Sequence, residues 1–227
     1  MSMWRVARLV AGKDLRVELR SRVVSNQVLP FAALVMVMFA FALDNDTVLN
    51  RVAPGLVWLA ALFSLLVLVQ RAFAIETADG ALDALTVAGV RPGGIFLGKA
   101  LALAAQLAVL ELVVQVLAVV LYRAHVGSSG VLLLICTFLA SVTSLAFVGT
   151  LYGGLSAGAK GRETLLPLLM LPVVAPVLIG ATRATEAALG TNGATSSEGW
   201  PWVGLLALFA AVFGIGGTYA FGSLIDA

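Results

Sequence analysis

Ser156 is the first candidate nucleophile in this sequence, because it lies at the centre of Gly154-Leu155-Ser156-Ala157-Gly158. A G-x-S-x-G sequence presents a serine nucleophile in many hydrolases, where a histidine must accept the serine proton. The sequence has one histidine, His125, and the membrane spans predicted below place it about one bilayer thickness from Ser156. We therefore expect no Ser–His pair and no hydrolase activity.

The same stretch, extended to Lys160, is similar to a phosphate-binding loop. Ala159 stands where the second glycine is needed, and Gly161 replaces the Ser or Thr that would hold magnesium. We therefore expect no ATP hydrolysis by this chain. Cys136 is the only cysteine and His125 the only histidine, so neither a disulfide nor a zinc site is expected. A solvated loop residue is a simpler interpretation of His125 than a haem ligand. We assign no catalytic, metal-binding or cofactor-binding residue.

Glu111 is an ionisable residue inside a long apolar run. Such a group is costly at the middle of a membrane and normally faces a cavity or a partner. Gln115 lies one turn further along the same helical face. Two interpretations remain open. One is a proton relay or substrate contact, and the simpler one is a buried hydrogen bond to another helix, with Glu111 protonated.

Long uncharged stretches indicate that these residues belong to a polytopic membrane protein. Of the 227 residues, 61% are hydrophobic and 11% are charged, and the mean hydropathy is +1.05. A helix needs about 20 apolar residues to cross the hydrocarbon core. The sequence therefore predicts an all-α protein with six transmembrane helices, at 24–43, 52–70, 95–122, 131–156, 164–182 and 201–225.

The distribution of Lys and Arg predicts the orientation. Eleven of the 14 basic residues lie in the N-terminal segment 1–22, in the 71–99 connection or in the 157–163 loop. Basic loops stay in the cytoplasm, so both termini are expected there. The small net charge of +2 gives no support to a nucleic-acid partner, because the positive charge faces anionic lipid instead.

The N-terminal segment 1–22 is expected to form a helix at the membrane interface, ahead of a membrane domain at 23–227. Glu18 and Arg22 stand in the favourable order for an i,i+4 ion pair. The apolar positions fall into two groups, which suits an interfacial helix with other protein against it. A solvated basic tail is one alternative. A cleaved signal peptide is another, but the acidic residues and the length of this segment argue against it.

The 71–94 connection is the most informative soluble segment. Apolar residues recur at helical spacing and carboxylates line the other side, so we expect a short amphipathic helix in the cytoplasm. The apolar positions are Leu82, Leu85 and Ala88, and the carboxylates are Glu76, Asp79 and Asp83. Gly80 permits a tight helix start. Such a surface suits docking to a cytosolic partner, and the alternative is an interfacial loop helix with solvated carboxylates.

Two stretches carry a resemblance to a known family. The first combines Ala53-Pro54-Gly55, Trp58, Arg71, Phe73, Glu76, the run 79–85, Pro92 and Lys99. The second is the proline-rich run from Leu166 to Pro172, followed by Pro176. Together they look like ABC-2-type permeases and, more narrowly, the heme exporter protein B (CcmB) family. The resemblance covers essentially the whole chain in length and in the number and order of spans.

This resemblance implies a permease subunit of cytochrome c biogenesis in a bacterial inner membrane. It implies a separate CcmA-like ATPase that docks through Arg71, Glu76, Asp79, Gly80, Leu82, Asp83 and Leu85. The further partners implied are a haem-handling CcmC-like subunit, a small CcmD-like subunit and a CcmE-like haem chaperone. The tryptophan-rich motif and external histidines of CcmC are missing here, so the complex, and not this chain, would handle haem. ATP-driven closure would push on the 71–94 helix and release haem-loaded chaperone at the outer face.

Two features depart from the family pattern, Glu111 and the Ala88-Gly89-Val90 stretch, and they put the substrate path in doubt. An ABC-2 exporter of lipid or drug, a non-transporting membrane scaffold and an intramembrane enzyme are the alternatives. The missing catalytic pairs argue against the enzyme.

Overall fold

The computed structural model describes residues 2–43, 45–78, 89–122, 127, 130–157 and 162–225. Over these residues the protein contains helices and no strands, which confirms the predicted all-α class. The helices are α1 (Met3–Ser21), a π-helix (Val24–Val28) that leads into α2 (Leu29–Ala42), α3 (Asp46–Ala78), α5 (Pro92–Tyr122), α6 (Val131–Ser156), α7 (Arg162–Leu189), a 3-10 turn (Thr191–Gly193) and α8 (Ser196–Ile225).

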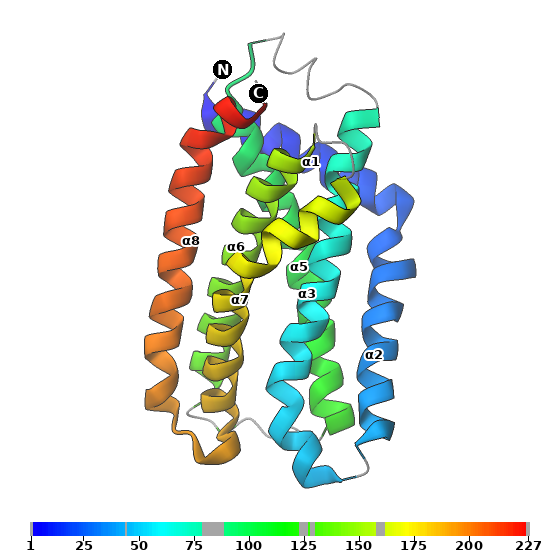
Figure 1. Cartoon of the computed structure of the whole chain (residues 1–227), viewed down its shortest axis with the longest axis vertical. Helices are drawn as coiled ribbons and strands as arrows, with labels where there is room; N and C mark the ends of the chain where they lie inside the picture. Colours follow the sequence, from blue (N-terminus) through cyan, green and yellow to red (C-terminus); the bar gives the residue numbers. More distant parts are fainter. Residues whose placement is uncertain are drawn as a thin grey trace.

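Six segments of the described chain are long and apolar enough to cross a membrane, as predicted. They are Val24–Ala42, Asp46–Ala74, Pro92–Tyr122, Val131–Ser156, Leu165–Leu189 and Ser196–Ser223. Figure 1 shows the long helices side by side, with α1 lying across one end of the bundle. Both chain termini lie at this same end.

Several helices are longer than the sequence predicted. α3 begins at Asp46, where the Asn45 side chain accepts hydrogen bonds from the backbone N–H groups of Thr47 (3.0 Å) and Val48 (3.2 Å). It then runs to Ala78, so residues 71–78 continue this helix and do not start a separate one. α7 likewise reaches Leu189, beyond the end of the predicted span at residue 182. Hydropathy marks where a helix enters lipid, whereas capping decides where it ends.

α7 contains Pro167, Pro172 and Pro176. Each proline removes a backbone donor and clashes with the preceding turn, which bends a helix. Figure 1 shows the result, because the first part of α7 crosses the bundle obliquely before the helix turns along the other spans.

The G-x-S-x-G serine ends a helix. Ser156 is the last residue of α6, and its hydroxyl donates to the carbonyl oxygen of Gly153 at 3.2 Å. A hydrolase would need a strand-to-helix turn at this point, so the local geometry does not present a nucleophile. His125, Lys160 and Gly161 lie outside the described residues.

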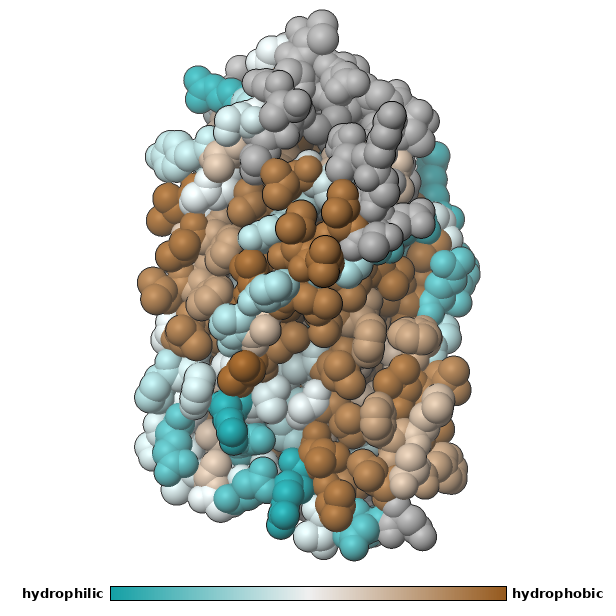
Figure 2. Space-filling view, in the orientation of Figure 1, coloured by the Kyte–Doolittle hydropathy of each residue, from teal (hydrophilic) through white to brown (hydrophobic). Residues whose placement is uncertain are grey.

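The outer surface of the bundle is apolar, as expected for a protein in lipid. Phe41 and Tyr219 are each 84% exposed, while Trp58, Phe73 and Phe96 are buried inside the bundle. Figure 2 shows hydrophobic residues over much of the height of the bundle and hydrophilic residues gathered near its lower end. Lipid, and not water, is therefore the solvent of this surface.

Glycines on α5 allow α1 to lie directly against it. A Cβ atom on Gly98 would be 2.6 Å from Cβ of Val10 and 2.7 Å from the carbonyl oxygen of Ala7. The sequence pattern Gly94-xxx-Gly98 is thus a packing contact. Only part of the predicted apolar surface of α1 is used, because Val6, Ala7, Val10 and Ala11 are buried whereas Val17 and Leu19 are exposed.

We predict that Gly98→Ala lowers the stability of the protein by about 1–3 kcal/mol, because the added methyl overpacks the α1–α5 contact. Gly204→Ala in α8 is the matched control, since nothing lies within 4 Å of a Cβ there. Thermal unfolding midpoints in detergent measure both effects. Equal shifts for the two variants would show that α1 does not pack on α5 in this way.

Candidate functional site

Lys99 is a basic residue buried inside α5, with 3% of its surface exposed. Its Nζ lies 3.4 Å from Oδ2 of Asp14 on α1 and 3.4 Å from the carbonyl oxygen of Ala72 on α3. The same ammonium is 4.8 Å from the centroid of the Phe73 ring. We call Lys99, Asp14, Ala72 and Phe73 the Lys99 cluster. A buried ammonium without such partners would cost several kcal/mol, so the cluster joins α1, α3 and α5.

A second contact joins α1 to α3 nearby. Oε2 of Glu18 lies 3.7 Å from Nε of Arg71, and Oε1 accepts a 2.6 Å hydrogen bond from the backbone N–H of Val24. The predicted Glu18–Arg22 pair does not form. α1 ends at Ser21, and Arg22 adopts a left-handed conformation with φ 52° that takes it off the helix. Of the predicted coupling residues, Arg71 is therefore in contact with α1.

The other predicted coupling residues are not placed. The backbone of Glu76 belongs to α3, whereas Asp79, Gly80, Leu82, Asp83 and Leu85 lie outside the described residues. α3 precedes this connection and α5 follows it. The Lys99 cluster includes residues close to both of its ends. A displacement applied to the connection would therefore act on α1, α3 and α5 together. Docking through these residues stays a prediction.

Glu111 is buried within the bundle, with 1% of its surface exposed. Both of its carboxyl oxygens, and Nε2 of its neighbour Gln115, are buried and make no hydrogen bond with any described residue. The expected hydrogen bond to another helix is therefore not found in the described chain. The hydroxyl of Ser141 on α6 is buried without a partner as well. Polar groups this deep normally have partners, so Glu111 and Gln115, one turn apart on α5, make up a candidate intramembrane site.

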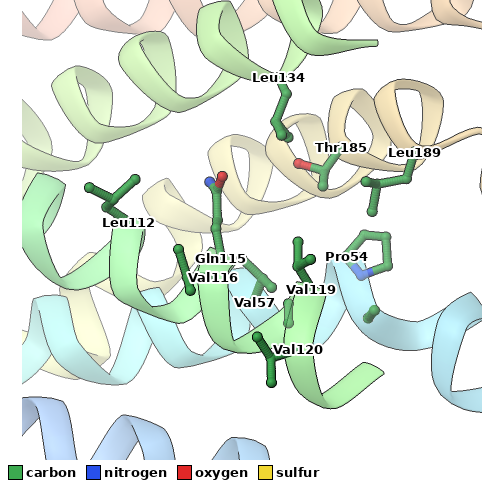
Figure 3. A pocket seen from close by; sticks show the side chains of 12 residues that line it. Pro54, Val57, Leu112, Gln115, Val116, Val119, Val120, Leu134, Thr185 and Leu189 are labelled. Atoms are coloured by element: carbon green, nitrogen blue, oxygen red, sulfur yellow. The ribbon is translucent and has the colours of Figure 1, made fainter. Parts of the chain in front are cut away.

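A cavity of about 280 Å³ lies beside Gln115, between α3, α5, α6 and α7. Figure 3 shows the Gln115 amide directed into this cavity, among mainly apolar side chains such as Leu112, Val116 and Leu134. Thr185 on α7 also lines it, and its hydroxyl oxygen accepts a 2.9 Å hydrogen bond from Nε1 of Trp58 on α3. The α3–α7 contact therefore forms one wall of the cavity.

The sequence interpretation missed most of this geometry. It paired Glu18 with Arg22 and not with Arg71, and it gave neither Lys99 nor Thr185 a partner in another helix. One signal in the sequence pointed to the contact between Lys99 and α1. Lys99 is a basic residue inside a predicted span and so needs an acidic partner, and 1–22 contains only two acidic residues. No group of three or more His, Cys, Asp or Glu side chains suited to a metal ion occurs within the described ranges.

We predict that Lys99→Met destabilises the protein by up to about 3 kcal/mol, because it leaves a largely buried carboxylate without its buried partner. Lys13→Met is the control. Lys13 Nζ lies 3.3 Å from the same Asp14, but its side chain is 47% exposed against 2% for Lys99. We expect a change within about 1 kcal/mol for this variant. Thermal unfolding midpoints of the two variants measure these effects. Equal shifts for Lys99→Met and Lys13→Met would contradict a special role for Lys99.

For Glu111, we predict that Glu111→Gln keeps near-normal membrane abundance while Glu111→Lys does not. Glutamine is a neutral side chain of the same size, whereas lysine at this depth costs about 2.5–3.5 kcal/mol. Quantitative immunoblots of washed membranes measure abundance. A Gln variant as scarce as the Lys variant would show that the fold needs an ionised carboxylate.

Comparison with known proteins places this architecture in a family. Residues 5–226 match the family model described as CcmB protein. The chain is 32% identical to heme exporter protein B of Rhodobacter capsulatus over 186 residues, which cover 81% of this chain and 84% of the relative. It is 32% identical to heme exporter protein B of Escherichia coli K12 over 209 residues, with 83% of each chain covered. The relative of the same name in Pseudomonas aeruginosa is 28% identical over 219 residues, or 92% of each chain. A match from residue 5 to residue 226 includes the Lys99 cluster, Glu111 and all six spans, and the chain therefore belongs to the CcmB family.

Proposed function

We propose that this chain is the membrane permease subunit of an ABC transporter complex that exports or delivers haem during cytochrome c biogenesis. The single observation that carries this proposal is the family match over residues 5–226, with relatives named heme exporter protein B. The arrangement of six spans with an additional helix across one end supports it.

ATP hydrolysis belongs, in this proposal, to a separate CcmA-like subunit. The 154–161 stretch lacks the residues of a phosphate-binding loop, so the energy must enter from outside the chain. The connection between α3 and α5 is the proposed docking site. The Lys99 cluster supports this assignment, because it links both flanking helices to α1 and so resists their independent movement.

Movement at the docking site would then reach the other end of the bundle. Closure of the ATPase pair pushes on the connection and tilts α3 and α5 against the remaining spans. The cavity beside Gln115 has walls from α3, α5, α6 and α7, so this tilt changes its shape. The proposed result is release of haem-loaded chaperone at the outer face. Haem itself is handled by a CcmC-like subunit with a small CcmD-like subunit and a CcmE-like chaperone, and this chain binds no cofactor of its own.

We further propose that the protein lies in the bacterial inner membrane with both termini in the cytoplasm. The excess of basic residues in 1–22, 71–99 and 157–163 supports this orientation. The position of both termini and α1 at one end of the bundle agrees with it.

Alkaline phosphatase fusions test the orientation, because this enzyme is active only outside the cytoplasm. We expect activity from a fusion after His125 and none from a fusion after Ala227. The reverse pattern would show that the protein has the opposite orientation, with the proposed docking site outside the cytoplasm.

The function is tested in a bacterium that lacks its own heme exporter protein B. The chain, expressed with its ATPase, should restore c-type cytochromes. The Glu76→Lys and Asp83→Lys double variant should insert normally but lose the ATPase in a detergent pull-down, since like charges at an interface can cost several kcal/mol.

The matched control is the Asp46→Lys and Glu198→Lys double variant, which makes the same charge change at the first turns of α3 and α8. It should retain the ATPase. Full retention of the ATPase by the Glu76 and Asp83 variant would show that the ATPase contacts another part of the chain. Failure of the wild-type chain to restore c-type cytochromes would overturn the proposed function itself.

A further inference from the structure

A groove of about 510 Å³ lies where α1 leads into the first span. Its lining includes the polar residues Arg22, Ser25 and Asn26, and the apolar residues Leu29, Ala105 and Val109, the last two from α5. Gln106 of α5 also lines the groove. The groove is thus lined by both polar and apolar side chains.

The groove crosses the boundary between the membrane-spanning part of the chain and the part outside it. Arg22 precedes the first span, Val24–Ala42, whereas Leu29 and Val109 lie inside spans. At this depth a phospholipid presents its phosphate first, then its ester carbonyl groups and then its acyl chains. The order of side chains along the groove matches the order of these groups.

Two charged residues, Arg22 and Glu18, line the groove, and Arg22 is the basic one. Oε1 of Glu18 accepts a hydrogen bond from Val24, and its Oε2 faces Arg71. The Arg22 guanidinium makes no ion pair or hydrogen bond with any described residue, and neither does the Gln106 amide. The groove therefore offers one unused cation and one unused amide.

The backbone around Arg22 is unusual. Arg22 has φ 52°, which is uncommon for a residue other than glycine, and a π-helix follows at Val24–Val28. π-helices are rare and are often found at functional sites. Here the left-handed conformation of Arg22 ends α1, and Arg22 lines the groove.

We propose that this groove binds an anionic phospholipid of the cytoplasmic leaflet. The phosphate contacts Arg22, an ester carbonyl oxygen accepts a hydrogen bond from the Gln106 amide, and one acyl chain lies on Ala105, Val109 and Leu29. Anionic lipids are enriched where basic segments meet the cytoplasmic leaflet, and this choice of leaflet rests on the orientation proposed above. A bound lipid would then contact both α1 and α5, because residues of both helices line the groove.

Native mass spectrometry of the full chain in detergent tests this site, with phosphatidylglycerol and phosphatidylcholine of identical acyl chains as probes. We expect selective retention of phosphatidylglycerol. Arg22→Gln should weaken its binding about fivefold, the factor for about one basic residue near a lipid surface. Arg8→Gln removes an exposed charge from α1 outside the groove, so it should weaken binding less than about twofold.

A second pair of variants leaves the charge unchanged. Ala105→Trp should fill the acyl part of the groove and abolish retention, whereas Leu101→Trp on the same helix, outside the groove, should not. Equal losses for Arg22→Gln and Arg8→Gln, equal retention of the two lipids, or no effect of Ala105→Trp would overturn the proposal. Displacement of the lipid by inorganic phosphate would also overturn it in favour of a free-anion site. The isolated chain is used, so the outcome does not depend on whether an ATPase docks.

Discussion

A buried ammonium group inside a membrane-spanning helix needs anionic and dipolar partners, and Lys99 obtains them from two other helices. Asp14 comes from α1, and the Ala72 carbonyl and the Phe73 ring come from α3. Because the cost of leaving this charge unpaired is several kcal/mol, the three helices are held in one arrangement. The close α1–α5 contact at Gly98 permits that arrangement, and the groove beside Arg22 is formed where α1 ends.

This constraint supports the proposed function, in which ATP hydrolysis by a separate subunit acts on this chain through the connection between α3 and α5. α3 and α5 flank the proposed docking connection and run as unbroken helices to the cavity beside Gln115. Long helices transmit tilt over their full length, whereas loops would absorb it. The hydrogen bond from Trp58 to Thr185 joins α3 to α7 at the wall of this cavity.

Sequence alone predicted the six spans and the family, because hydropathy and the proline-rich run are local signals. It predicted helix ends less well, since Asn45 capping and the continuation of α3 to Ala78 do not depend on hydropathy. Contacts between distant residues could not be predicted. Asp14 and Lys99 are 85 positions apart, and Trp58 and Thr185 are 127 apart. For Glu111 the burial was predicted correctly, but the expected interhelical partner was not found.

The central claim is that the Asp14–Lys99 contact holds α1 to the two helices of the docking connection. A double-mutant cycle with Asp14→Asn and Lys99→Met tests it most directly, with the free energy of unfolding measured in detergent for all four proteins. We expect a coupling energy of about 1.5–3 kcal/mol, as found for residues that interact directly. Additivity within about 0.5 kcal/mol would contradict it, because the two side chains would then stabilise the protein independently.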